Sequence, residues 1–382
     1  MSRSRSIARA AYRAMKDVPL IGVPLRAARH RLGPQPRASA RPKAGGSPIE
    51  FFGKPLSKRL SKNATVNFNP LEKVTSEKLL ATSIDVKKVV SDKINSGEYP
   101  LVPHPCYACG GHKFRRVAEI ERFGFQLPTA ICTSCGLVQS NPALPQAALF
   151  DFYKNYYRAL YGANRAVAEE TIRKKANNAG KAVYDYVKKA RVLPSPSSRK
   201  LIVEVGAGDG SIVSYFADQG HNVIGVDFDQ EYMATARKLG YDLRTGPLSA
   251  VDLPSKPHLI YYNHVLEHIA ELNEEIATLS RVIADGGHVA IIVPGVKHLT
   301  LGSYKGDLVA YLQIAHVAHF SLATLTYLFS RHGFELVVGN ERVQAVFKKT
   351  NCPALPLRGN SEYHSTIYSL TWLERRYLST NG

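Results

Sequence analysis

The chain has 382 residues, 45% of them hydrophobic, and a formal net charge of +19 at pH 7. Its length exceeds one typical domain, and its apolar content can bury a substantial core. No apolar run reaches the roughly 18 residues that a membrane-spanning helix needs, which excludes an integral membrane protein of the helical kind. We therefore expect a soluble, cytoplasmic protein with one main domain and attachments.

The first segment, residues 1–48, is a basic tail. Residues 1–47 contain nine Arg and two Lys against one acid, Asp17, so more than half of the formal net positive charge lies there. Blocks of like charge with scattered Pro and Gly are typical of a disordered segment. Besides a solvated tail, three interpretations stay open: a peripheral contact with the inner membrane surface, a nucleic-acid arm, and an organellar transit peptide.

A cysteine motif follows an extension, residues 49–100, that the sequence leaves unassigned. Cys106 and Cys109 form one C-x-x-C pair, and Cys132 and Cys135 form a second. Two residues between thiolates let both sulfurs reach one tetrahedral zinc ion, and the glycine after each pair permits the required turn. We expect a structural zinc site in a small ribbon-like module over residues 101–158.

Other chemistry remains open for this module. Two disulfides or a redox pair are alternatives, but nothing in the sequence indicates an oxidising compartment. Basic residues between the cysteine pairs also allow nucleic-acid binding, which we consider the less favoured partner because no aromatic RNA-stacking pattern accompanies them.

Helices and strands alternate in the second half of the chain. A helix near 164–192 belongs to a connecting segment, residues 159–198, that ends in a Pro- and Ser-rich linker. The core, residues 199–350, predicts an α/β fold with a doubly wound sheet whose last strand is antiparallel. Its seven expected strands are 201–205, 222–227, 242–244, 258–263, 287–293, 334–339 and 342–348. Residues 351–382 are a C-terminal extension.

The first strand of this core ends in a glycine-rich turn. Gly206, Gly208 and Gly210 alternate before a helical pattern, and the next apolar run ends at Asp227. A turn of this kind, whose glycines have no side chains, is typical of a site where the backbone contacts a nucleotide-like ligand. Because Ser211 stands where a dinucleotide fold has its third glycine, S-adenosylmethionine is favoured over a nicotinamide cofactor.

An acidic residue followed by G-x-G-x-G resembles the first motif of the class I S-adenosylmethionine-dependent methyltransferases, which have a Rossmann-like sheet. The resemblance implies that Glu204 lies near the methionine ammonium, that the glycine turn holds methionine and ribose, and that Asp227 accepts from the ribose hydroxyls. Further cofactor contacts are expected at the turn and at the ends of the next strands, from Ala207, Phe228, Leu248, Asn263 and His264.

Three histidines are candidate catalytic bases. His268 ends the string V-L-E-H after the fourth strand, and His316 and His319 lie in the loop after the fifth. These positions face the carboxyl ends of the strands, where ligands of open α/β sheets bind, and an unperturbed imidazole has a pKa of about 6.5. As alternatives, Glu267 and His268 cap or pair locally, and His319 packs against or caps the next helix.

Residues 101–348 resemble sugar methyltransferases that carry an N-terminal zinc module. The resemblance rests on C-x-x-C-G, on Asn141-Pro142, on the Phe- and Tyr-rich run at 149–157 and on the segment around His316. It implies a sugar acceptor, either nucleotide-linked or within a bacterial surface polysaccharide. The C-methylating members have Glu-His where this chain has Ala315-His316, so we expect methylation at oxygen.

Three other functions stay open at this point. An RNA methyltransferase would use the zinc module and the basic tail to hold phosphates. A quinone or phenol O-methyltransferase would also contain the V-L-E-H string. A cofactor-binding regulatory or scaffold protein would perform no transfer.

Overall fold

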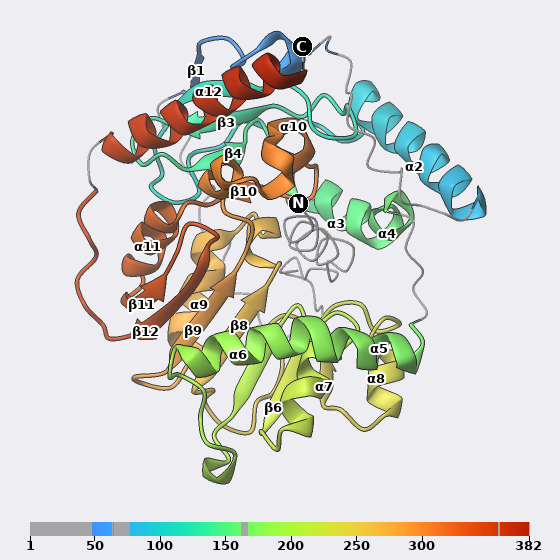
Figure 1. Ribbon diagram of the computed structural model, residues 1–382, viewed down its shortest axis with the longest axis vertical. Helices are drawn as coiled ribbons and strands as arrows, with labels where there is room; N and C mark the ends of the chain where they lie inside the picture. The colour runs from blue at the N-terminus through green and yellow to red at the C-terminus, as the bar shows by residue number, and fades with distance from the viewer. Residues whose placement is uncertain (1–47, 63, 65–76, 162–166, 358–359, 382) are drawn as a thin grey trace, which may run out of the picture.

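The computed structural model describes residues 48–62, 64, 77–161, 167–357 and 360–381. The predicted basic tail lies outside the described residues except for residue 48, and so does the expected start of the helix at 164. None of the described helices is long and apolar enough to cross a membrane. Two sheets organise the described part of the chain (Figure 1).

The larger sheet has seven strands in the order β11-β12-β9-β8-β5-β6-β7. They are β5 (Ile202–Val205), β6 (Val223–Asp227), β7 (Leu243–Thr245), β8 (Leu259–Asn263), β9 (His288–Ile292), β11 (Phe334–Gly339) and β12 (Gln344–Lys349). From β5 to β9 all neighbours are parallel, whereas β12 pairs antiparallel with both β9 and β11. The predicted α/β class, the seven strands and the antiparallel last strand are confirmed.

Helices cover both faces of this sheet. They are α6 (Lys181–Lys189) and α7 (Ser211–Asp218) on one face, and α9 (Leu272–Val282) and α11 (Leu322–Ser330) on the other. Successive strand side chains point to opposite faces, so Leu259 and Tyr261 pack with the first pair of helices while Ile260 and Tyr262 pack with the second. Burial on both faces explains why these strands are continuous apolar runs in the sequence.

The smaller sheet contains the cysteine segment and has the order β1-β2-β3-β4-β10. Its strands are β1 (Glu50–Phe52), β2 (Lys113–Ala118), β3 (Thr129–Cys132), β4 (Val138–Ser140) and β10 (Ala318–His319). β1 pairs parallel with β2, and β10 pairs antiparallel with β4. The sheet therefore takes one strand from the extension before the cysteines and another from the loop after β9.

The two ends of the described chain meet beside this smaller sheet. The long helix α12 (Ser361–Asn381) crosses it and contacts β3 (Figure 1). Arg59 forms ion pairs with Glu374 of α12, at 2.6 Å, and with Asp307, at 2.8 Å. These partly buried contacts connect both extensions to the same sheet.

The remaining helices surround these layers or connect them. They are α2 (Glu77–Ser96), α3 (Gln146–Asn155), α4 (Tyr157–Leu160), α5 (Glu169–Lys175), a π-helical turn (Ala176–Gly180), α8 (Ala234–Lys238) and α10 (Leu308–Tyr311). Short 3-10 turns include Lys58–Leu60, Pro196–Ser198, Leu266–His268, Lys297–Leu301 and Ser303–Gly306. The turn at Leu266–His268 directly follows β8 and contributes to the candidate site.

Candidate active site

The glycine turn between β5 and α7 packs tightly against the turn that follows β8. Gly206 has a φ of +74°, and a Cβ atom there would lie 2.4 Å from Val265 Cγ2. Only glycine fits this combination of left-handed backbone and close approach. The turn predicted to hold the cofactor is thus in contact with the residues next to Glu267 and His268.

Asp227 ends β6 beside this turn. Its Oδ2 accepts a hydrogen bond from the Gly208 backbone N–H at 2.8 Å, and its Oδ1 accepts from the Asp229 N–H at 2.9 Å. Burial raises the pKa of Asp227 to about 7. Both carboxylate oxygens are therefore held in place at the carboxyl end of the sheet, and Phe228 follows in a half-buried position.

Glu204 lies inside β5 and is 1% exposed. Burial raises its pKa well above the usual range, and the Tyr261 hydroxyl donates to its Oε2 at 3.2 Å. Ala207 and Leu248 are also buried, while Asn263 and His264 are half-buried at the end of β8. Because β5 to β8 are parallel, these predicted cofactor residues lie along one edge of the sheet.

Four polar side chains form a buried group, the Glu–His cluster, which consists of Glu267, His268, His316 and His319. Each is at most 2% exposed. Glu267 Oε1 lies 3.6 Å from His268 Nε2 and 3.8 Å from His316 Nε2. The structure brings together the three histidines named from the sequence and adds the carboxylate of Glu267, which the sequence suggested would cap or pair locally.

Two hydrogen bonds to backbone carbonyls hold this cluster in place. The Val317 N–H donates to the Glu267 carbonyl at 2.9 Å, and the Ser140 hydroxyl donates to the His316 carbonyl at 3.2 Å. His264, next to the cluster, has a left-handed φ of 56°. A non-glycine residue in that conformation stores strain, which is commonly found at functional sites.

Burial sets the charge state of the imidazoles. It lowers the pKa of His268 to about 4 and that of His319 to about 3, and it lowers the pKa of His316 well below the usual value. Nearby Arg122 adds to the shift at His319, and its guanidinium donates to the Tyr311 and Leu312 carbonyls at 3.3 Å. All three imidazoles are therefore neutral at physiological pH.

Several polar atoms of the cluster make no hydrogen bond within the described part of the protein. They are both carboxylate oxygens of Glu267, His268 Nε2, His316 Nδ1 and His319 Nδ1. A buried polar atom without a partner costs about 1–3 kcal/mol, so their concentration at one place calls for a ligand.

Two residues that sequence reasoning missed orient these imidazoles. The hydroxyl of Tyr153, on α3, lies 3.0 Å from His268 Nδ1 and donates to the Ala315 carbonyl at 2.9 Å. The amide nitrogen of Gln313 contacts His316 Nε2. Tyr153 belongs to the Phe- and Tyr-rich run noted in the sequence, but no spacing pattern connects it with a histidine 115 positions later.

The four cysteines of the two C-x-x-C pairs converge. Their sulfurs lie within 4.8 Å of one another, with Cys106 and Cys135 at 3.5 Å and Cys109 and Cys132 at 3.6 Å. Zinc bound by sulfur at about 2.3 Å places tetrahedral sulfurs about 3.8 Å apart, so this donor set fits the ion. All four are free thiols, and Cys352 is free and exposed.

The larger sheet's helices support the cysteine site. Asn273, at the start of α9, donates to the Tyr107 carbonyl at 2.6 Å, and His332 contacts the Asn273 side chain at 3.2 Å. Arg331, after α11, donates to the Ala108 carbonyl. The first C-x-x-C loop is thus fixed to the larger sheet's helical layer.

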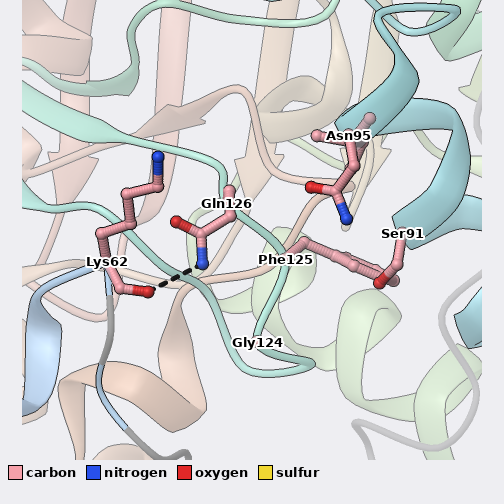
Figure 2. A pocket seen from close by; sticks show the side chains of 7 residues that line it. Lys62, Ser91, Asn95, Gly124, Phe125 and Gln126 are labelled. Atoms are coloured by element: carbon pink, nitrogen blue, oxygen red, sulfur yellow. Dashed lines mark hydrogen bonds between the residues drawn. The ribbon is translucent and has the colours of Figure 1, made fainter.

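A surface cleft lies away from these groups. Residues of α2 and of the turn at Gly124 form it, with Gln126 Nε2 donating to the Lys62 carbonyl at 2.8 Å (Figure 2). No residue predicted for the cofactor, the metal or the catalytic step lines this cleft.

Comparison with known proteins adds to this description. Residues 180–338 match a family model described as a methyltransferase domain. A probable S-adenosylmethionine-dependent methyltransferase of Mycolicibacterium smegmatis is 28% identical over 138 residues, which cover 35% of this chain and 52% of the relative.

Two further relatives also match part of the chain. A ubiquinone biosynthesis O-methyltransferase of Aliivibrio fischeri is 30% identical over 24% of this chain and 42% of its own length. The C-methyltransferase NovU of Streptomyces niveus is 26% identical over 36% of this chain and 33% of its own length. The matches thus span about half or less of these relatives.

Proposed function

We propose that this protein, whose residues 180–338 match a methyltransferase domain, is a class I S-adenosylmethionine-dependent enzyme that transfers a methyl group to a hydroxyl oxygen of a sugar, nucleotide-linked or within a surface glycan. The observation that carries this proposal is the Glu–His cluster, which lies beside the glycine turn with several buried polar atoms lacking partners. A sugar brings many hydroxyl groups, which would supply those partners.

The cofactor edge of the sheet fits S-adenosylmethionine. Gly206 lets the turn at the end of β5 pack against Val265, and Glu204 would supply a buried carboxylate for the ammonium group of the methionine part. Asp227 would accept from the ribose hydroxyls, and Phe228, Leu248, Asn263 and His264 would complete the surroundings. When bound, the cofactor supplies a methyl group already activated by a sulfonium.

The Glu–His cluster would orient the acceptor and receive its proton. As the acceptor oxygen forms its bond to the methyl carbon, the carbon–sulfur bond of the sulfonium would break and leave S-adenosylhomocysteine as a neutral thioether. The proton of the acceptor O–H would pass to a neutral imidazole of His268, His316 or His319. Imidazoles with such lowered pKa values are weak bases, so Glu267 must stabilise the imidazolium, and alignment of the acceptor supplies most of the acceleration.

Oxygen is the favoured acceptor atom because this chain has Ala315 before His316, where the C-methylating sugar methyltransferases that it resembles have a glutamate. Ala315 precedes His316, and its carbonyl accepts from Tyr153. Glu267 Oε1 is the carboxylate near His316, at 3.8 Å, and it comes from a different turn. A carbon acceptor would require the same base to form an enolate first.

We also propose that Cys106, Cys109, Cys132 and Cys135 bind a structural zinc ion. Four thiolates leave no coordination position open for chemistry, so the ion would stabilise the smaller sheet and, through β4 and β10, the loop that carries His316 and His319.

Transfer of labelled methyl from S-adenosylmethionine into fractionated cell extract tests the function. The fractions are nucleotide sugars, polymeric glycan, RNA and lipid-soluble quinones, and the wild type is compared with His316→Ala. We expect label in a sugar-containing fraction and a loss of at least a hundredfold in the variant.

Other outcomes would replace the proposal. Label in the quinone fraction would favour the second candidate, a quinone O-methyltransferase, which the Aliivibrio fischeri relative suggests. Label in RNA would instead indicate an RNA methyltransferase, in which the basic residues of the tail and of the zinc module bind the phosphates of the acceptor. No label in any fraction, with cofactor bound, would indicate a protein that binds without transferring.

A further inference from the structure

The hydrogen bonds around His268 determine which of its nitrogens carries the proton. A tyrosine hydroxyl has one proton, and Tyr153 donates it to the Ala315 carbonyl at 2.9 Å. Its oxygen must therefore accept from His268 Nδ1, 3.0 Å away. This network assigns the proton to Nδ1 and leaves a lone pair on His268 Nε2, which has no hydrogen-bond partner within the described residues.

The same reasoning applies to His316. The Tyr161 hydroxyl donates to Gln313 Oε1, so the amide NH2 of Gln313 faces His316 Nε2. That nitrogen accepts and therefore also carries a lone pair, while the proton is on Nδ1.

Both Nε2 atoms lie near one carboxylate oxygen. Glu267 Oε1 is 3.6 Å from His268 Nε2 and 3.8 Å from His316 Nε2. These distances exceed the roughly 3.2 Å limit of a hydrogen bond, as does the 3.5 Å from the same oxygen to His264 Nδ1. The carboxylate and the His268 Nε2 lone pair, both without a hydrogen-bond partner within the described residues, are stabilised by a cation between them. Glu267, His268 and His316 are at most 2% exposed, so bulk water does not screen them.

The spacing matches a shared metal ion. The ligand atoms of Glu267, His268 and His316 lie within 4.8 Å of one another. Ligands at about 2.1 Å from a tetrahedral ion are separated by about 3.4 Å, close to the two measured distances. The Tyr153 contact to His268 Nδ1 is also the outer bond that a metal-binding histidine usually makes.

We propose that Glu267, His268 and His316 bind a divalent transition-metal ion, separate from the ion at the four cysteines. Two imidazoles and one carboxylate suit zinc, manganese, iron or cobalt better than magnesium or calcium. On binding, the ion would replace the contact between Gln313 and His316 and hold both Nε2 lone pairs, which leaves His319 as the imidazole of the cluster that receives the acceptor proton. Only this last consequence rests on the proposed methyl transfer, because ion binding itself needs neither cofactor nor acceptor.

Zinc content measured by mass spectrometry tests the proposal on the full chain, with no cofactor or acceptor present. After loading with Zn²⁺ and desalting, we expect Glu267→Gln to contain one equivalent less per chain than the wild type. Tyr153→Phe should weaken binding by about 10–100-fold. Glu275→Gln, which alters a buried glutamate bonded to Tyr262, is the matched control and should retain the wild-type content.

A second measurement on the wild type avoids the question of folding in the variants. Co²⁺ is added stepwise and followed by absorption. Thiolate ligands give intense charge-transfer bands, so a further equivalent that adds only weak d–d bands would report the nitrogen and oxygen site. Equal zinc content in wild type and Glu267→Gln, or the lack of that further Co²⁺ equivalent, would overturn the proposal. Since neither readout involves methyl transfer, a failed transfer assay would leave this result intact.

Discussion

The four cysteines and the Glu–His cluster are two buried groups of metal-ligand side chains, and they are built in opposite ways. The cysteines come from one continuous segment and place identical sulfurs at nearly equal distances, 3.5 and 3.6 Å in the two closest pairs. The Glu–His cluster joins a turn after β8 with a loop after β9 and mixes carboxylate and imidazole atoms. The first group is complete in itself, whereas the second has polar atoms without partners.

This difference separates stability from function. A closed donor set stabilises the chain around it, while a cluster with unsatisfied buried atoms lowers stability and is retained for what it binds. Substitutions in the two groups should therefore change the free energy of unfolding in opposite directions, and this contrast can be measured.

The largest effect is expected for Cys132→Ser. Losing one of four zinc ligands should release the ion and reduce the free energy of unfolding by about 4 kcal/mol, because binding of the ion is coupled to folding of the segment around the cysteines. Zinc analysis and calorimetric melting would measure both. Cys352→Ser, at an exposed and separate cysteine, should stay within about 0.5 kcal/mol of the wild type. A Cys132→Ser protein that keeps its zinc would contradict the closed-site interpretation.

Gly206→Ala should be the next most harmful change. The new Cβ would lie 2.4 Å from Val265 Cγ2 on a backbone with φ +74°, which combines overpacking with left-handed strain, together about 3 kcal/mol. Cofactor affinity, measured by titration calorimetry, should fall more than tenfold. Gly240→Ala has a similar φ of +91° and no atom within 4 Å of the Cβ, so it should cost only about 1 kcal/mol and leave cofactor binding unchanged.

Glu267→Gln should act in the opposite direction on stability. In metal-free protein the substitution removes a buried charge without a hydrogen-bond partner, so we expect the free energy of unfolding to rise by about 1–2 kcal/mol. Methyl transfer should fall at least a hundredfold in the same variant. Urea unfolding and a transfer assay on one preparation would reveal both changes, and a destabilised variant would show that Glu267 is structural.

The smallest effect concerns the pH dependence of cofactor binding. Burial raises the pKa of Asp227 to about 7, so the carboxyl is protonated below that pH and ionised above it. Ribose hydroxyls bind the ionised form, and affinity should therefore increase about tenfold between pH 6 and pH 8, or about 1.4 kcal/mol. Calorimetry at three pH values would measure it. Asp227→Asn should bind more weakly with a flat profile; a flat wild-type profile would exclude this carboxyl as the titrating group.

The fold of the larger sheet could be predicted because its information is local. Burial on both faces produces apolar runs, and the expected strand at 222–227 differs by one residue from β6 (Val223–Asp227). The cysteine motif was likewise visible, since two residues between sulfurs already define how the pair can bind an ion.

The membership of the Glu–His cluster could not be predicted in the same way. Tyr153 reaches His268 across 115 positions, and Glu267 meets His316 only because the loop after β9 folds back over the turn after β8. β10 contains only two residues, too few for any alternation of polar and apolar side chains to show. β1 lies in the extension that the sequence left unassigned, and only its pairing with β2 gives it a role.

The pairing of β4 with β10 limits how this architecture can be recombined. The strand that completes the cysteine-bearing sheet is contributed by the loop that also holds His316 and His319. A hybrid enzyme that joined the N-terminal half of one relative to the C-terminal half of another would pair a β4 and a β10 from different proteins. Changes of acceptor in such proteins should therefore require the two halves to be exchanged, or to evolve, as a single inheritance unit.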